Sequence, residues 1–295
     1  MAEKDDDTVG DFPAYQPAYA EATETICEGK VDIAALTHPG LIREKNEDHY
    51  AVLRRYRSSS LLASSLPRDQ LPDDDEATTW MMVVADGLGG HASGEVASST
   101  AVSAIVRLAN QISSWIMRPS RDELVERVKL YADTIQEALS AMAEQNPSLT
   151  GMATTINALY LFGDEALVVN VGDSRAYHCR ENKIQQITDD HTLAKHMEKE
   201  GVSRESTQRF RNLVTRSFNT DGKTVEFDMF QVQLSPGDHV LLCSDGLTDM
   251  VDDDLISDSI QEAESTKEAC QLLLHAALEA GGRDNITTVL VRIKE

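Results

Sequence analysis

Acidic side chains stand at the ends of several apolar runs in this sequence, where they could form one site. They are Asp86, Asp173, Asp245 and Asp284. Residues at the ends of buried elements are held rigidly, as a site requires. If these acids converge, they repel one another, since two like charges about 4 Å apart cost roughly 4 kcal/mol at an effective dielectric near 20. A bound cation would offset that repulsion, and all-oxygen ligands favour Mg²⁺ or Mn²⁺ over zinc or copper.

Glycine and arginine neighbours add to this pattern. Asp86-Gly87 and Asp245-Gly246 place residues without side chains beside an acid, so that the backbone could approach a metal or an oxyanion. The alternative is that Asp-Gly is only a turn dipeptide. The stretch 43–48, Arg-Glu-Lys-Asn-Glu-Asp, adds a guanidinium that could hold two phosphate oxygens. Taken alone, it reads equally well as a solvated charged turn.

The elements that would position these acids follow from hydrophobic periodicity and turn residues. Strands are predicted over 31–36, 50–53, 80–85, 155–162, 166–171, 175–179, 225–234, 239–243 and 286–293. Helices are predicted over 94–112, 120–145 and 266–280, the last two beginning with Ser-x-x-Glu capping patterns. The first two strands look like an opening hairpin, and the strands over 155–179 look like antiparallel neighbours because their loops are short. We expect one domain of strands mixed with long helices.

Two stretches lie outside this pattern. Residues 1–24 carry few aliphatic side chains and are predicted to be a flexible acidic tail, leaving residues 25–295 as a single domain. Residues 54–79 hold a serine run, two prolines and an acidic run, which predicts a surface insertion. The segment 192–219 is polar and prone to form helix.

Composition narrows the class of protein. The chain has 295 residues, 41% of them hydrophobic, and a formal charge of −23, which disfavours nucleic acid or anionic membranes as partners. No apolar run is long enough for a membrane span, and the first residues lack the pattern of a secretory signal. The four cysteines form no Cys-x-x-Cys pair and read as reduced thiols. We therefore expect a cytoplasmic protein.

Five blocks together resemble a known signature. They are Gly-Leu-Ile-Arg-Glu-Lys-Asn-Glu-Asp (40–48), Val-Ala-Asp-Gly-Leu-Gly-Gly-His (84–91), Asn-Val-Gly-Asp-Ser-Arg-Ala-Tyr (170–177), Cys-Ser-Asp-Gly-Leu (243–247) and Gly-Arg-Asp-Asn-Ile-Thr (282–287). In this order they resemble the metal-dependent protein phosphatases of type 2C, in the form of the bacterial branch. The resemblance covers roughly residues 28–295. It implies an α+β fold with two antiparallel β-sheets packed as a central sandwich and helices outside.

The resemblance also implies roles for the acids around two Mn²⁺ or Mg²⁺ ions. Asp86 would bridge both ions, the carbonyl of Gly87 and the side chain of Glu47 would complete one, and Asp245 with Asp284 would hold the other. Asp173, with Asp245, matches the acids that hold a third, weaker ion in bacterial relatives. Asp48 would orient a coordinated water, and Arg43 would clamp the substrate phosphate.

The expected reaction is attack on phosphorus by a metal-activated water, in line with the leaving group and without a covalent intermediate. Parts for other mechanisms are absent from the sequence: no cysteine begins a Cys-x5-Arg motif, and Gly172-Asp173-Ser174-Arg175-Ala176 is only a near miss of a Gly-x-Ser-x-Gly elbow. Where animal members carry a general-acid histidine after Asp-Gly, this chain has Leu88. His91 is a candidate replacement or simply a helix-start residue, and a metal-bound water is the alternative proton donor.

The segment 192–219 matches the flap beside the active site of this family. His191 directly precedes it, His196 lies near its start, and Arg204, Arg209, Arg211 and Arg216 follow. These arginines predict a local basic rim that could meet a phosphopeptide, although a solvated amphipathic segment explains them equally well.

The function predicted from these observations is a protein serine/threonine phosphatase. Its partners would be proteins phosphorylated by a serine/threonine kinase, and the chain would act as a monomer. Two alternatives stay open: a phosphohydrolase of a small phosphorylated metabolite, and a non-catalytic phosphatase-like binding module. The complete set of Arg43, Glu47, Asp86, Asp245 and Asp284 argues against the last, because a degenerate relative would have lost one of them.

Overall fold

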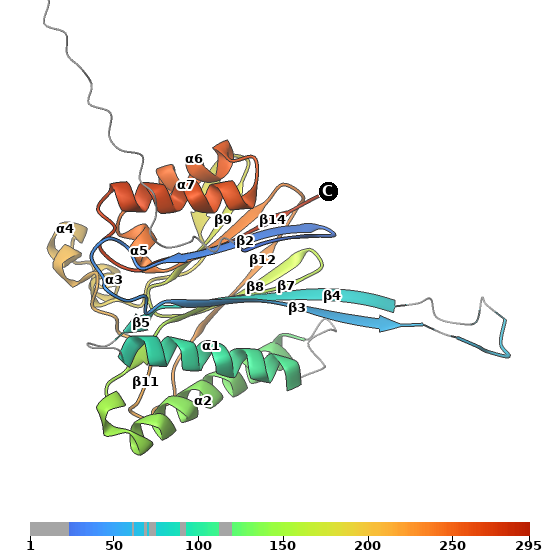
Figure 1. Cartoon of the computed structure of the whole chain (residues 1–295), viewed down its shortest axis with the longest axis horizontal. Helices are drawn as coiled ribbons and strands as arrows, with labels where there is room; N and C mark the ends of the chain where they lie inside the picture. The colour runs from blue at the N-terminus through green and yellow to red at the C-terminus, as the bar shows by residue number, and fades with distance from the viewer. Residues whose placement is uncertain (1–23, 61, 68–69, 71–74, 89–92, 112–119) are drawn as a thin grey trace, which may run out of the picture.

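Two antiparallel sheets packed face to face make up the centre of the computed structural model, which describes residues 24–60, 62–67, 70, 75–88, 93–111 and 120–295 (Figure 1). One sheet has the strand order β1 (Glu24–Glu28), β2 (Val31–His38), β14 (Ile286–Ile293), β13 (His239–Cys243), β9 (Arg175–Arg180), β10 (Lys183–Gln186). The other has the order β12 (Asp228–Gln233), β8 (Glu165–Val171), β7 (Ile156–Phe162), β4 (Asp75–Ala85), β3 (His49–Ser59). A small third sheet joins β11 (Phe218–Asn219), β6 (Ala153–Thr154) and β5 (Gly87–Leu88).

Helices cover the outer face of each sheet. The five-stranded sheet packs against α1 (Ser93–Gln111) and α2 (Arg121–Gln145), and the six-stranded sheet packs against α5 (Asp245–Thr248), α6 (Asp253–Glu262) and α7 (Thr266–Glu279). The capping box predicted at Ser120 and Glu123 is present, and the side chain of Ser265 accepts a hydrogen bond from the backbone of Glu268. The arrangement confirms the predicted α+β sandwich of two sheets with helices outside.

Strands in this sandwich are apolar on both faces, because each sheet lies between two apolar layers. In β4, Met82 and Val84 face the other sheet, while Met81 and Val83 pack under α1 and α2. The continuous apolar runs of the sequence therefore mark strands buried on both sides. Because neither face of such a strand is polar, its sequence does not indicate to which of the two sheets it belongs.

The expected opening hairpin is wrong. β2 pairs with β1 and β14 in one sheet, whereas β3 pairs with β4 in the other, so the loop between β2 and β3 crosses the sandwich. The first hairpin is instead β1 with β2. The prediction of β8 and β9 as neighbours is also wrong, since β8 pairs with β7 and β12 while β9 pairs with β10 and β13. Gly172 and Asp173 thus lie where the chain changes sheets.

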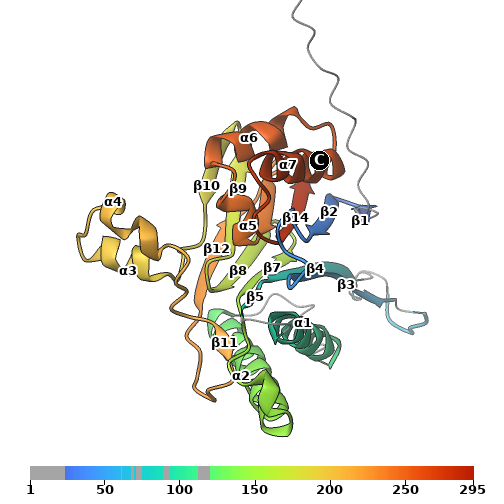
Figure 2. The same cartoon turned by 60° about the vertical axis from the view of Figure 1, so that its left-hand side comes forward.

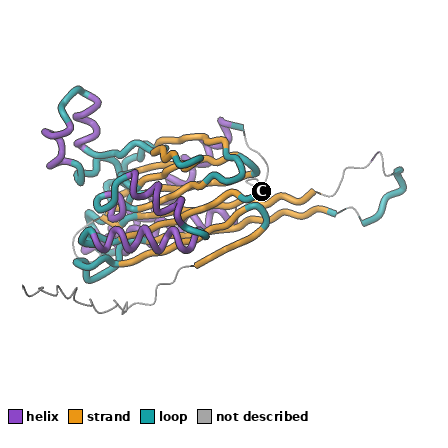
Figure 3. The backbone as a smooth tube through the Cα atoms, turned by 90° about the horizontal axis from the view of Figure 1, so that it is seen from above, coloured by secondary structure: helices purple, strands orange, loops and turns teal. Residues whose placement is uncertain are grey.

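Strand extends into the segment expected to be an insertion. β3 continues to Ser59 and β4 already begins at Asp75, and only the part of β4 from Thr79 onward also pairs with β7. The outer halves of β3 and β4 therefore form a two-stranded ribbon that projects beyond the other strands (Figures 1 and 3). Most of the predicted N-terminal tail, residues 1–23, lies outside the described residues. Within the described residues, no helix is both long and apolar enough to cross a membrane.

The turn before β13 holds a buried ion cluster at Asp238, which is 2% exposed. Its carboxylate accepts hydrogen bonds from Arg180 Nε at 2.8 Å, from the backbone N of Ser235 at 2.8 Å and from His178 Nε2 at 3.0 Å. Burial by itself would raise the pKa of Asp238, but these donors outweigh it and lower that pKa to about 2. The cluster ties β9 to the turn between β12 and β13.

We expect Asp238→Asn to lower the free energy of unfolding at pH 7 by about 2 kcal/mol, because a carboxyl pKa near 2 in the folded state against an ordinary value near 4 is worth that much. The folded pKa is depressed, so this stabilisation is complete above about pH 4 and is lost as the pH falls toward 2. Urea denaturation at pH 7 and pH 3 measures it. The difference in free energy of unfolding between wild type and variant should be smaller at pH 3 than at pH 7. Equal free energies of unfolding at pH 7 would refute the prediction.

Candidate active site

Buried and half-buried carboxylates converge at one end of the sandwich, where the loops carrying the sequence-predicted acids meet. Asp86 follows β4, and Asp245 opens α5 directly after β13 and Ser244. Burial and the negative charges of Asp48, Asp173, Asp245 and Asp284 raise the pKa of Asp86 well above its usual range. Burial and the charges of Asp173, Asp284, Asp249 and Asp48 raise the pKa of Asp245 in the same way. The acids thus repel one another across a shared space, the condition that a divalent cation relieves.

Backbone contacts hold Asp86 in place. Its N–H donates to Thr155 Oγ1 at 3.1 Å, and its carbonyl accepts from the backbone N of Thr155 and from Thr154 Oγ1, both at 2.9 Å. These threonines precede β7, the strand that pairs with β4. The turn after β4 is therefore fixed from the neighbouring strand of its own sheet.

Gly87 lies in tight backbone packing next to Asp86. A Cβ on Gly87 would come within 2.4 Å of the carbonyl oxygen of Gly94, and a Cβ on Gly94 would come within 2.7 Å of the carbonyl oxygen of Gly87 and 3.0 Å of Glu47 Cδ. Glycine at both positions lets the start of α1 approach the Gly87 carbonyl and the Glu47 carboxyl group. The structure therefore brings Glu47 and the carbonyl of Gly87 together beside Asp86. Burial raises the pKa of Glu47.

Asp48, the residue after Glu47, is buried, with 4% of its surface exposed. Its Oδ2 accepts a hydrogen bond from Ser244 Oγ at 2.7 Å, and Ser244 Oγ accepts from the backbone N of Thr287 at 3.0 Å. Its Oδ1 is buried without a hydrogen-bond partner, and burial raises the pKa of Asp48 to about 6. An unsatisfied buried carboxylate oxygen needs a ligand such as water or an ion.

Asn285 ties the loops together and was given no role by the sequence patterns. Its Oδ1 accepts from the backbone N of Glu47 at 2.7 Å, and its Nδ2 donates to the carbonyls of Pro39 and Lys45, both at 2.9 Å. One amide side chain thus fixes the loop that carries Arg43, Glu47 and Asp48 to the start of β14. Its place in the block 282–287 was the only signal for this role.

Arg43 and Asp284 face each other at the surface of the site. Arg43 Nη2 donates to Asp284 Oδ2 at 2.6 Å, the backbone N of Asn285 donates to Asp284 Oδ1 at 2.9 Å, and the Arg43 side chain is 53% exposed. The bond to Asp284 raises the pKa of Arg43 above its ordinary value. The guanidinium is therefore charged and accessible to a phosphate, although in this state it engages an acid that was expected to bind a metal.

The donor set at this end of the sandwich fits hard divalent cations, because its side chains offer carboxylate oxygens and Asp48 and Asp173 each have an unsatisfied buried Oδ1. Within the described ranges, no three His, Cys, Asp or Glu side chains are arranged so that they alone could hold one ion. An ion here would thus need water or backbone carbonyls among its ligands, which is how Mg²⁺ is usually bound.

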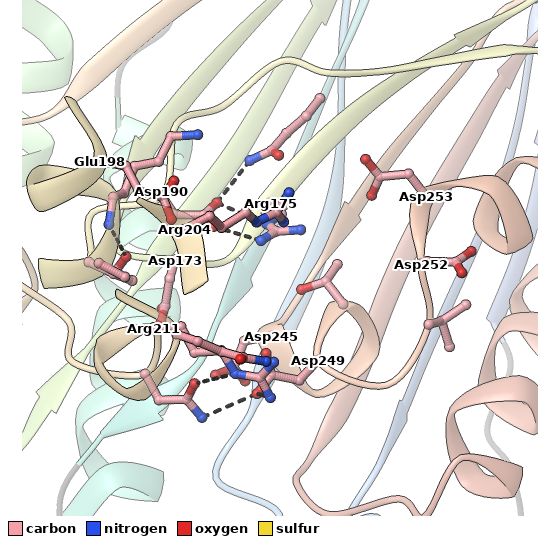
Figure 4. Close-up of a pocket in the computed structure, with 18 of the residues that line it drawn as sticks. Asp173, Arg175, Asp190, Glu198, Arg204, Arg211, Asp245, Asp249, Asp252 and Asp253 are labelled. Carbon is pink, nitrogen blue, oxygen red and sulfur yellow. Dashed lines mark hydrogen bonds and ion pairs between the residues drawn. The ribbon is translucent and has the colours of Figure 1, made fainter. Parts of the chain in front are cut away.

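A cavity of about 1000 Å³ opens beside Asp173 and Asp245 (Figure 4). One wall comes from α3 (Leu193–Lys199) and α4 (Arg204–Thr207) in the segment 192–219, which stands out from the sandwich in Figure 2. The facing wall comes from the residues around α5 and the start of α6. Asp173 is 6% exposed, and burial with the charges of Asp190 and Asp249 raises its pKa to about 7.

The expected basic rim is wrong for half of its members. Arg204 and Arg211 line the cavity, but Arg211 lies 3.5 Å from Asp249. Arg209 stacks over the ring of Phe210, and Arg216 donates to Asp228. Of the histidines, His196 pairs with Glu200 on the surface of α3, and His91 lies outside the described residues.

His191 connects the base of this segment to the Gly172-Asp173 turn. Its Nδ1 accepts from the backbone N of Gly172 at 3.1 Å, so the proton of the neutral ring lies on Nε2, which donates to Asp228 Oδ2 at 3.0 Å. The backbone N of Thr215 donates to the carbonyl of His191 at 2.7 Å. Both ends of the segment are thereby joined to the turn that carries Asp173.

We expect His191→Ala to lower the free energy of unfolding by about 2 kcal/mol, because it leaves the buried N–H of Gly172 without an acceptor. Hydrogen exchange at the Gly172 amide should accelerate. His191→Asn is the matched control, since its Oδ1 can occupy the position of Nδ1 and should keep that amide protected. Equal exchange in both variants would show that the ring does not hold this turn.

Comparison with known proteins identifies the family. A sequence model described as protein phosphatase 2C matches residues 61–287. The chain belongs to the protein phosphatase 2C family. It is 32% identical over 267 residues to the serine/threonine phosphatase stp of Listeria welshimeri, covering 86% of this chain and 93% of that one.

Two further relatives extend the match. The chain is 33% identical over 263 residues to the serine/threonine protein phosphatase PstP of Mycobacterium tuberculosis, covering 88% of this chain but only 44% of PstP. The crystal structure of a PstP catalytic domain in complex with two manganese ions superposes with a TM-score of 0.69 at 31% identity, covering 90% of this chain and 99% of that domain. These findings confirm the predicted class of enzyme, a metal-dependent protein serine/threonine phosphatase of bacterial type.

Proposed function

We propose that the chain removes phosphate from phosphoserine and phosphothreonine in proteins by direct attack of water on phosphorus, at the end of the sandwich where Asp86 and Asp245 lie. The observation that carries this proposal is the convergence of acids from distant loops, where burial and mutual repulsion raise the pKa values of Asp86 and Asp245. A non-catalytic binding module would have no reason to keep this unfavourable arrangement.

The residues that would hold the metals follow from their positions and from the family. Glu47 and the Gly87 carbonyl would hold one ion, Asp245 and Asp284 would hold the other, and Asp86 would serve both. Asp173 would contribute, with Asp245, to a third and weaker site. Mn²⁺ or Mg²⁺ bound here supplies Lewis-acid chemistry, which lowers the pKa of water and neutralises charge on the phosphoryl oxygens.

The remaining side chains bind and orient. Arg43 is charged and half-exposed, so it can exchange Asp284 for two phosphate oxygens of the substrate. Asp48 Oδ1, held by the bond from Ser244 to Oδ2, can accept a hydrogen bond from the attacking water and fix its direction. The proton donor to the leaving group stays a prediction, with His91 as the candidate side chain.

The partners implied are phosphoproteins made by a serine/threonine kinase, with the chain acting as a monomer in the cytoplasm. The four cysteines, Cys27, Cys179, Cys243 and Cys270, are unpaired, which supports a reducing compartment.

Hydrolysis of p-nitrophenyl phosphate and of a phosphothreonine peptide, each titrated with Mn²⁺ and Mg²⁺, tests this function. We expect turnover of both substrates only with metal. Turnover in the presence of a chelator would overturn the mechanism, and preference for a phosphosugar over every phosphopeptide would point to a small-molecule phosphohydrolase instead.

Arg43→Ala should raise KM for the phosphopeptide by about 10- to 100-fold, because a charge-assisted clamp is worth about 1.5 to 3 kcal/mol. The melting temperature should change little, since this side chain is half-exposed. Lys45→Ala, in the same loop, is the matched control and should leave KM unchanged. A large loss of stability in Arg43→Ala would show that Arg43 is structural.

A further inference from the structure

The cavity between the flap segment, residues 192–219, and the start of α6 is continuous with the proposed reaction site, because Asp173 and Asp245 lie on its wall. A protein substrate whose phosphorylated side chain reaches that site must place neighbouring residues close by. With a volume of about 1000 Å³, the cavity has room for one or two side chains of such a segment.

The lining of this cavity is strongly acidic. It contains nine Asp or Glu residues and four Lys or Arg residues. Most of the bases are already paired: Arg175 makes a two-pronged bond to Asp190 at 2.8 and 2.7 Å, Arg211 lies 3.5 Å from Asp249, and Lys195 lies 4.0 Å from Asp189. The unbalanced charge in the cavity is therefore negative.

The surplus acids lie on facing walls. Glu205 comes from α4, and Asp252, Asp253 and Asp254 come from the start of α6, within a stretch 245–266 that has no Lys or Arg. Figure 4 shows Asp252 and Asp253 on their wall of the cavity. Asp173, 6% exposed, lines the same cavity with an Oδ1 that has no hydrogen-bond partner. That buried oxygen is the one we assign to the third metal site, so the acids left to meet a substrate are Glu205 and those at the start of α6.

Apart from Asp173 and Asp245, which we assign to a metal, the acids of the cavity are spread in a way that favours separate positive charges over a further metal ion. In the part of the chain that the structure describes, no three acidic, histidine or cysteine side chains are grouped tightly enough to hold an ion unaided. Lysine and arginine side chains, by contrast, are long and carry single charges that can each meet one wall. Complementary charge of this kind steers encounter and selects among partners.

We propose that the flap cavity binds lysine or arginine side chains that flank the phosphorylated residue of the substrate, so that this phosphatase prefers basic phosphoprotein segments. The inference rests on the proposed function and adds a substrate class to it. It also reverses the expectation of a basic rim, because the acids of the facing wall outweigh the arginines of the flap segment.

Three phosphothreonine peptides of equal length, flanked by arginine, alanine or glutamate, test this inference with Mn²⁺ present. We expect kcat/KM for the arginine peptide to exceed that for the glutamate peptide by about tenfold at low ionic strength, mainly through KM. The preference should shrink at about 0.5 M salt, where charges are screened over a few ångströms. Equal kcat/KM values for the three peptides would overturn the inference.

A pair of double variants localises the effect. Glu205→Gln with Asp254→Asn removes two charges from the cavity, and Asp258→Asn with Glu262→Gln removes two charges from α6 at positions that do not line it. We expect the first pair to reduce the preference for arginine several-fold and the second to preserve it, with p-nitrophenyl phosphate turnover unchanged in both. An equal loss in both pairs would overturn the inference, since net charge alone would then explain the preference.

The result with the alanine peptide distinguishes a failure of this inference from a failure of the proposed function. If that peptide is hydrolysed and the flanking charge has no effect, only the inference fails. If no phosphopeptide is hydrolysed while p-nitrophenyl phosphate is, the proposed function fails, and the inference fails with it.

Discussion

Replacing Asp86 by asparagine is expected to abolish phosphatase activity, with a fall in kcat of at least about a thousandfold, as preorganised charges at the reacting group are worth several kcal/mol. The same change should make the metal-free protein more stable at pH 7. Burial and four nearby acids raise the pKa of Asp86 in the folded state, so this group opposes folding at every pH above its ordinary pKa near 4, and an uncharged amide of the same shape removes that cost. Asp245→Asn should behave alike.

Both effects are measurable in one preparation. Turnover of p-nitrophenyl phosphate at saturating Mn²⁺ reports kcat, and melting with and without Mn²⁺ reports stability and its coupling to the ion. In the wild type Mn²⁺ should raise the melting temperature, and in Asp86→Asn this rise should be lost. Asp164→Asn, in the exposed turn between β7 and β8, is the control and should change neither. A metal-free Asp86→Asn protein less stable than the wild type would show that the acid is structural.

The positions of helices and strands could be predicted from the sequence far better than the pairing of the strands in sheets. The helices predicted at 120–145 and 266–280 are marked in the sequence by capping residues and by apolar residues at helical spacing. In the structure, both ends of each helix lie within one residue of the predicted positions. Sheet membership could not be read, because β2, β4 and β8 are apolar on both faces and nothing local assigns them to one sheet. The loop at Gly172 and Asp173 is as short as a hairpin loop, although it connects β8 and β9, which belong to different sheets.

The candidate site could likewise be predicted from the sequence only in part. Acids at strand ends and the order of five blocks pointed to loops that the structure brings together, because these are local properties of the chain. The bonds that hold the site are long-range: Arg43 meets Asp284 across 241 positions, and Glu47 meets Asn285 across 238. Neither the role of Asn285 nor the link from His191 to Gly172 follows from any spacing, since both depend on how the two sheets come together.

Gly246→Ala is expected to lower both the stability and the activity of the protein. A Cβ on Gly246 would lie 2.0 Å from the carbonyl oxygen of Asn285 and 2.9 Å from its carbonyl carbon, so α5 and the start of β14 would have to separate. Overpacking against backbone costs about 3 kcal/mol. Moving Asn285 would also disturb its bond to the backbone N of Glu47 and the neighbouring Asp284, so kcat should fall with stability.

Urea denaturation and p-nitrophenyl phosphate turnover measure the two consequences of this change. Gly163→Asn is the matched control: its φ of +61° suits asparagine and a Cβ there would meet nothing within 4 Å, so it should cost less than about 1 kcal/mol and leave kcat intact. If Gly246→Ala folds normally but loses turnover, the contact serves to place the acids more than to hold the fold. A variant with wild-type stability and wild-type turnover would mean that this close approach of two loops has no part in either.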